Sequence, residues 1–327
     1  TMLLFGLLML GGAGVGAFHP EAAVTAGSLL PGQRTRGLSI FMFGGALGLG
    51  LGPLLSGFAV SRWGFSGLAY TAVPLAAGVL LLSWIGGFYR FSPSTPRPTA
   101  RLSLSETFEG RIGVAVLLLA VCSFRLVPNM GMDKVLSFIM QSDGNSVLEI
   151  GRTQSMFLAS ASLGMMLMAF RFRAGWEKPF LIGCPLAGIP VLYVLGLEGL
   201  PGWLTSACLI AVGMLLWGTS PAMVSYAQQL FPRGAGVASA LTMGLSWGLG
   251  GLLQAPITAW FHSIGQPRLA LWGFVPFLVL SAAGACLLPG SSQWGRATEA
   301  DEPEPAPVDA AAPPVAAEPE LNPASTV

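Results

Sequence analysis

Long stretches of this chain carry almost no charge, and this constrains its fold more than any other feature. Residues 37–89 contain one charged side chain, Arg62. Residues 179–232 also contain one, Glu198. Over all 327 residues, 9% are charged and the mean hydropathy is +0.68, whereas a soluble domain carries about 25% charged residues. The sequence therefore predicts an integral membrane protein and excludes a soluble globular enzyme.

The apolar stretches have the length of membrane-spanning helices. A helix needs about 20 apolar residues to cross the hydrocarbon core of a bilayer. Strands of a membrane barrel would instead alternate in polarity over about 10 residues, and no such alternation is present. We therefore expect an all-α polytopic helical bundle with about nine transmembrane helices. The expected spans are residues 2–22, 38–60, 68–88, 112–140, 154–170, 179–197, 203–230, 235–261 and 269–288.

Positive charge alternates between the connections that join these spans. One set of connections carries eleven Arg or Lys residues, and the intervening set carries three. Positive charge marks the cytoplasmic side of a membrane protein. We therefore expect the longest connection, 89–111, and the C-terminus to face the cytoplasm, in the plasma membrane (the inner membrane of a bacterium).

The C-terminal segment differs in composition from the rest of the chain. Its last 32 residues hold seven acidic residues and seven prolines. Such a composition is typical of extended, solvated segments. Residues 291–327 are predicted to form a disordered, acidic, Pro/Ala-rich tail, and nothing in the sequence indicates nucleic-acid binding.

An internal repeat relates two parts of the chain at an offset of about 200 residues. Pro20 and Pro31 are eleven positions apart, as are Pro221 and Pro232. A glycine-rich helix follows each pair, and glycines four residues apart predict faces on which helices pack. These glycines are Gly44, Gly48, Gly52, Gly244 and Gly248.

The repeat predicts how the chain is organised. Many transporters consist of two related halves that enclose a site near the middle of the membrane. Three helices precede the second copy within its own half, and none precedes the first copy, so we expect three of six plus six helices to be missing at the N-terminus. The expected parts are a partial half-bundle (1–88), a cytoplasmic linker (89–111), a six-helix half-bundle (112–290) and the tail (291–327).

Several segments resemble the major facilitator superfamily, and within it the fosmidomycin-resistance type of efflux transporter. The match is most specific at Phe-His-Pro-Glu and at Tyr-Ala-Gln. The resemblance implies a twelve-helix antiporter that exports a drug or another small molecule. The family's Asp between the eighth and ninth helices is absent from the corresponding connection, 171–178. The matching segments are 14–21, 39–45, 51–55, 226–232 and 244–251.

The span 112–140 contains the best candidates for a functional site. Arg125, Asn129 and Asp133 recur every four residues and therefore share one face of a helix. Charges at membrane depth are costly and are often functional. Pro128 and Gly131 interrupt the same helix, which favours a cavity there. The guanidinium suits binding of an anionic substrate and the carboxylate suits proton transfer. The alternatives are a structural ion pair, or a shorter helix that ends near Asp133.

Two ionisable residues flank Pro20 in the first span. His19 titrates near physiological pH, and Glu21 does so when it is partly desolvated. The second copy of the repeat has Ser220 and Ala222 at these places, so the bend recurs and the ionisable pair does not. This pattern favours a role in proton coupling. The alternative is a hydrogen bond from His19 to a carbonyl that Pro20 leaves free.

Three further polar residues lie within apolar helices. Such residues ordinarily make hydrogen bonds between helices, and contact with a substrate is the second possibility. They are Tyr226, Gln228 and Gln254.

The sequence indicates no enzyme, metal or cofactor chemistry. The four cysteines lie singly in apolar stretches, and two histidines cannot form a metal cluster. Neither a phosphate-binding G-x-x-x-x-G-K-[ST] loop nor a G-x-S-x-G elbow is present. An ion gradient is therefore the expected source of energy.

These observations together predict a secondary transporter, expected to export a small organic molecule in exchange for protons by alternating access. Its expected partners are the substrate, protons and the lipid bilayer, and we expect a monomer. The alternatives are an uptake transporter for a small metabolite, a non-transporting receptor or scaffold, and a channel. A channel would favour rings of like charge around a pore, which the sequence does not show.

Overall fold

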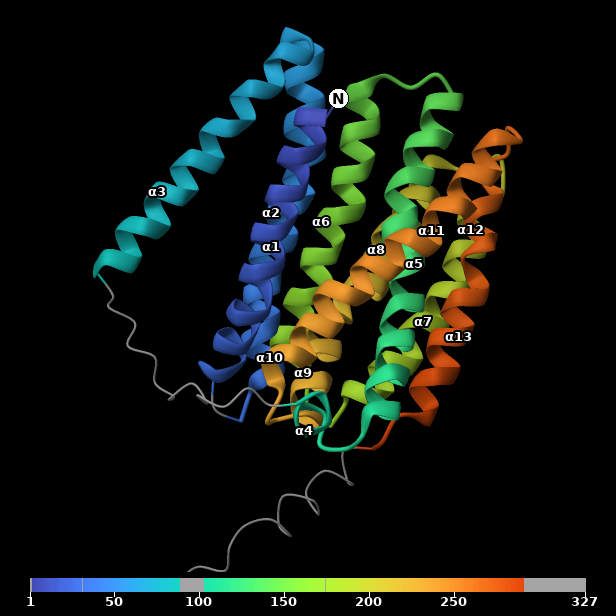
Figure 1. Ribbon diagram of the computed structural model, residues 1–327. Coiled ribbons are helices and arrows are strands. Elements are labelled where there is room, and N and C mark those ends of the chain that lie inside the picture. The colour runs from blue at the N-terminus through green and yellow to red at the C-terminus, as the bar shows by residue number, and fades with distance from the viewer. Residues whose placement is uncertain (1, 31, 89–102, 174, 291–327) are drawn as a thin grey trace, which may run out of the picture. The chain divides into compact units, whose positions relative to one another are not determined.

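The computed structural model describes residues 2–30, 32–88, 103–173 and 175–290 (Figure 1). Within these ranges the fold is helical and contains no strand. This confirms the predicted all-α bundle. The predicted tail, 291–327, and residues 89–102 of the predicted linker lie outside the described residues.

Each predicted span is helical, and some consist of two or three consecutive helices. The single helices are α1 (Met2–Ser28), α2 (Arg34–Trp63), α5 (Ile112–Ser142), α6 (Val147–Arg171) and α7 (Glu177–Leu195). The spans made of several helices are α8 (Gly202–Gly218) with α9 (Ser220–Leu230), α10 (Ala235–Ala240) with the π-helical turn η2 (Leu241–Leu245) and α11 (Ser246–Ser263), and α12 (Leu269–Gly273) with α13 (Val275–Leu287).

Within the described residues, eight helical segments are long and apolar enough to cross a membrane. The remaining predicted span, 68–88, consists of the end of a 3-10 helix, η1 (Phe65–Thr71), and of α3 (Ala72–Phe88), which has 17 residues. A short helix, α4 (Leu104–Thr107), precedes α5. The chain is thus a multi-pass membrane protein by the length and composition of its helices.

Small residues bring α2 close to α6. A Cβ atom added to Gly50 would lie 2.9 Å from the backbone nitrogen of Ala159. A Cβ atom on Gly151 would lie 2.6 Å from the carbonyl oxygen of Pro53. Side chains at either position would therefore push the two backbones apart, and glycine allows their close approach.

The glycines predicted to pack are a different set. Among the described residues, a Cβ atom added at any of them would meet nothing within 4 Å, and each is exposed. No described helix therefore packs on the predicted faces, because spacing identifies a face of a helix and does not tell whether a neighbour covers it. The positions are Gly44, Gly48, Gly52, Gly244 and Gly248.

Burial in the structure follows the internal repeat. Buried residues of α2 recur 200 positions later in the α10–α11 segment. Five residues separate α1 from α2 in the sequence and four separate α9 from α10, which explains why the prolines and the later residues differ in offset. The matching pairs are Ser39 and Ser239, Met42 and Thr242, Ala46 and Ser246, and Gly50 and Gly250.

The segment before α5 attaches to one end of the bundle, which we call the linker end (Figure 1). Ser103 caps α4, and hydrogen bonds from its side chain and backbone lower the pKa of the Glu106 carboxyl. Phe108 meets Phe231 edge to face, with ring centroids 5.1 Å apart. Arg111 donates a hydrogen bond of 2.6 Å to the carbonyl oxygen of Leu230. The linker end thus contains α4, the end of α9 and the start of α5.

Candidate functional site

Arg125 lies in the middle of α5 and is completely buried. Its Nη1 donates to the carbonyl oxygen of Leu216 and, at 2.8 Å, to Oγ1 of Thr219. Its Nη2 donates to Oγ of Ser220 at 3.3 Å. Asn129, 1% exposed, donates from Nδ2 to the same Leu216 carbonyl at 3.2 Å. The structure therefore brings together two of the three predicted α5 residues.

The acceptors of this cluster come from the junction of α8 and α9. Pro221 stands near the start of α9 and has no N–H to give to the preceding turn. At this point the Leu216 carbonyl also accepts a hydrogen bond of 3.0 Å from Thr219 Oγ1. The predicted interruption of the 112–140 helix at Pro128 and Gly131 is wrong, because α5 is one continuous helix from Ile112 to Ser142. The break lies instead between α8 and α9, at Thr219.

The charge of Arg125 has no acidic partner among the described residues. All its hydrogen bonds there go to neutral oxygens, and Nε makes none. Oδ1 of Asn129 and Nε1 of Trp217 are also buried without a partner. A buried charge is costly unless it is paired, so the guanidinium is suited to receive an anion. A structural ion pair with Asp133, the alternative from the sequence, is not formed.

Asp133 lies two turns further along α5 and is partly buried. Its Oδ1 is buried and has no hydrogen-bond partner among the described atoms. Gln154 of α6 donates to the backbone carbonyl of Asp133 at 3.1 Å rather than to its carboxylate. The helix continues to Ser142, so Asp133 does not lie at the end of a shorter helix.

The structure places His19 and Glu21 away from the α5 cluster. Nδ1 of His19 lies 3.1 Å from the carbonyl oxygen of Val15, one turn earlier in α1. Glu21 is exposed. Neither side chain shares a described hydrogen bond with Arg125, Asn129 or Asp133. The alternative from the sequence, a bond to the carbonyl that Pro20 leaves free, is not formed, because Pro20 lacks the N–H that would reach Gly16 and His19 contacts Val15 instead.

The three remaining polar candidates each have a separate partner. Tyr226 is buried, and its hydroxyl donates to the carbonyl oxygen of Pro289 at 2.8 Å. Gln228 is buried and donates to Oγ of Ser239 at 2.8 Å. Gln254 accepts from its own helical neighbour Thr258 at 3.2 Å. Of these contacts, only that of Gln228 is a hydrogen bond between helices, as predicted. Tyr226 bonds a residue beyond the end of α13, and Gln254 bonds within its own helix.

One buried acidic residue carries no distinguishing signal in the sequence. Glu177, the first residue of α7, is 2% exposed and accepts hydrogen bonds from Thr35 of α2 and Gln229 of α9. It stands in the charged connection 171–178, close to Arg173 and Lys178 in sequence. Glu177 differs from the other charged residues of this connection in that α2 and α9 bury it.

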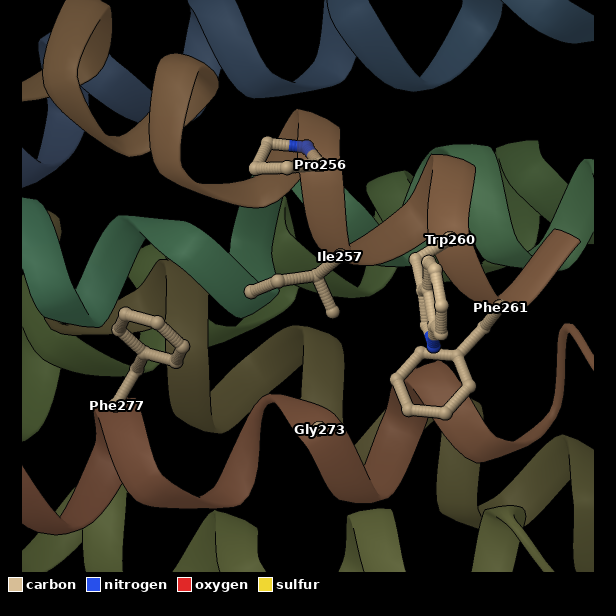
Figure 2. A pocket seen from close by; sticks show the side chains of 6 residues that line it. All are labelled: Pro256, Ile257, Trp260, Phe261, Gly273 and Phe277. Carbon is tan, nitrogen blue, oxygen red and sulfur yellow. The ribbon is translucent and has the colours of Figure 1, made fainter. Parts of the chain in front are cut away.

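An apolar groove lies between α11 and the α12–α13 segment (Figure 2). Its volume is about 480 Å³, and aromatic rings from both segments surround it. It contains none of the predicted site residues and offers no charged group for a polar ligand. The lining residues are Pro256, Ile257, Trp260, Phe261, Gly273 and Phe277.

Comparison with known proteins identifies the family. The profile of the Major Facilitator Superfamily matches residues 1–255. The chain is 26% identical to the fosmidomycin resistance protein of Escherichia coli (strain K12) over 256 residues, which cover 76% of this chain and 62% of that protein. It is 24% identical to the uncharacterized MFS-type transporter YfnC of Bacillus subtilis (strain 168) over 281 residues, which cover 83% and 68%. The chain therefore belongs to the Major Facilitator Superfamily.

Proposed function

We propose that this protein is a secondary transporter that exports a small organic anion in exchange for protons. The observation that carries the proposal is the buried Arg125 guanidinium, which hydrogen-bonds neutral oxygens and whose Nε has no partner within the described part of the chain. A scaffold has no need of such a charge in a membrane, where it costs several kcal/mol, on the order of 3 at a helix centre. An anion bound there would offset that cost.

The relative named for fosmidomycin resistance supplies the first substrate to test. Fosmidomycin is a phosphonic acid and therefore an anion, which a guanidinium binds with two parallel hydrogen bonds. The full-length protein in membrane vesicles should move fosmidomycin against its gradient when a proton gradient is imposed. Movement in the opposite direction would establish uptake, and binding without movement would establish a receptor.

Asp133 is the residue we propose for proton transfer, because its carboxylate is partly buried and Oδ1 has no hydrogen-bond partner among the residues that the structure describes. Asp133→Asn should lower transport driven by a proton gradient at least about 100-fold, the low end of what a positioned proton-transfer group contributes. Exchange of substrate across the membrane without a gradient should continue. Substrate flux across the vesicle membrane, measured with and without an imposed proton gradient, tests this prediction.

The matched control is Asp143→Asn, because Asp143 is exposed and forms a surface ion pair of 2.9 Å with Arg268. This variant should transport normally, since exposed pairs contribute only about 0–1 kcal/mol. Equal loss in both variants, or normal driven transport by Asp133→Asn, would contradict the role of Asp133.

The charge bias between the connections supports a cytoplasmic linker end. In a variant without native cysteines, Leu104→Cys should resist a membrane-impermeant maleimide added to intact cells, because Leu104 lies at the linker end. Glu198→Cys, exposed between α7 and α8 at the other end, should react. The reverse labelling pattern would overturn the proposed orientation.

A further inference from the structure

Glu177 is a buried carboxylate to which three parts of the chain donate hydrogen bonds. Its Oε1 accepts from Thr35 Oγ1 of α2 at 3.2 Å and from Gln229 Nε2 of α9 at 3.1 Å. Its Oε2 accepts from the backbone N–H of Gly175 at 2.9 Å. The donors described are all neutral. A carboxylate removed from water needs such donors, because an unpaired buried charge is far more costly than an unpaired neutral group.

Ser225 of α9 completes this group of side chains. Its Oγ lies 2.6 Å from Thr35 Oγ1 and 2.8 Å from Gln229 Nε2. Thr35 has one hydroxyl proton for two neighbours, so when it donates to Glu177 the Ser225 hydroxyl can donate to Thr35. The four residues, which we call the Glu177 cluster, then form a closed network: Thr35, Glu177, Ser225 and Gln229.

The cluster joins segments that the sequence predicts to belong to different half-bundles. Thr35 stands in the first turn of α2, whereas the other three residues belong to α7 and α9. A second contact lies close by, because a Cβ atom on Gly27 of α1 would lie 3.0 Å from Gln228 Oε1 of α9. Hydrogen bonds to a charged acceptor are about twice as strong as neutral ones, and water can replace Thr35 once the segments separate.

We propose that Glu177 is a positioning residue that holds α2 against α7 and α9 and so keeps the linker end of the bundle closed. The inference rests on the proposed transport by alternating access, in which this end must open and close. Closing the contact buries the carboxylate among its donors, and opening it exposes the carboxylate to water. The cluster thus favours the closed state without fixing it.

Accessibility of Ser39 tests the inference without any substrate. Ser39 is buried one turn beyond Thr35 in α2, so Ser39→Cys in a variant without native cysteines reports opening of the linker end. Glu177→Gln and Thr35→Val should each speed its reaction with an impermeant maleimide about 10-fold, the ratio expected when a charge-assisted hydrogen bond is lost. The vesicles must present the linker end to the reagent.

The matched control is Glu198→Gln, an exposed acid beyond the other end of α7, which should leave the rate unchanged. Unchanged rates in both test variants would overturn the proposal. A cysteine pair at Thr35 and Ser225, whose oxygens are 2.6 Å apart, should stop transport on oxidation and restore it on reduction. Full transport by the cross-linked protein would also overturn it. If the Ser39→Cys protein with Glu177 and Thr35 unchanged reacts with the maleimide as expected and yet transports no substrate, that result would instead contradict the proposed function.

Discussion

Arg125→Gln is expected to lower transport of an anionic substrate at least about 30-fold, because removing one partner of a buried, hydrogen-bonded charge pair costs about 2–5 kcal/mol. Arg125→Lys should recover only part of the loss. A lysine keeps the charge and lacks the planar fork that reaches Thr219 and Ser220 together. Initial rates of substrate flux in vesicles, normalised to the amount of protein, measure the effect.

Two controls separate binding of the anion from support of the fold. Arg173→Gln removes an exposed cation that lies over the ring of Trp176, 5.6 Å from its centroid, and should transport normally. Thermal stability of the detergent-solubilised protein shows whether the Arg125 variants remain folded. Near-normal transport by a folded Arg125→Gln variant would show that Arg125 holds the α8–α9 junction in place and does not bind the substrate.

The second large effect is expected at Gly50. Gly50→Ala places a methyl group 2.9 Å from the backbone nitrogen of Ala159, and such overpacking typically costs about 1–3 kcal/mol. Gly48→Ala, two residues earlier in the same helix, meets no described atom within 4 Å. It should be neutral or stabilising by up to about 1 kcal/mol, since alanine favours helix over glycine. The unfolding temperature of purified Gly50→Ala should therefore fall. That of purified Gly48→Ala should stay the same or rise.

The quantity to compare is the difference in stability between Gly50→Ala and Gly48→Ala. Both substitutions add the same methyl group to α2, so differences in synthesis or membrane insertion affect them alike. Equal stability of the two variants would show that α2 and α6 separate without cost, and that the close approach at Gly50 and Gly151 does not hold them together.

The sequence was a good guide to helices because bilayer thickness sets their length and hydropathy reports it directly. It also placed Arg125 and Asn129 on one face, since residues four apart on a helix are neighbours. Their shared acceptor, the Leu216 carbonyl, lies about ninety residues away. Only tertiary packing brings it there, and no local pattern encodes that distance.

Other parts of the site depend on which helix covers which face. Spacing marked Gly48 as a packing residue, but a neighbour covers Gly50 instead. Glu177 stood among charged loop residues, and its burial comes from α2 and α9 closing over it. His19 shows the converse, because its hydrogen bond to Val15 is local and follows from the helix itself.

The crowded Leu216 carbonyl has a consequence for ion selectivity. In transporters with interrupted helices, carbonyls released from helical bonding commonly coordinate Na⁺. Here that oxygen accepts from Arg125, Thr219 and Asn129, which fills both of its lone pairs, and the guanidinium adds a positive charge beside it. We therefore expect the Leu216 carbonyl not to coordinate a sodium ion.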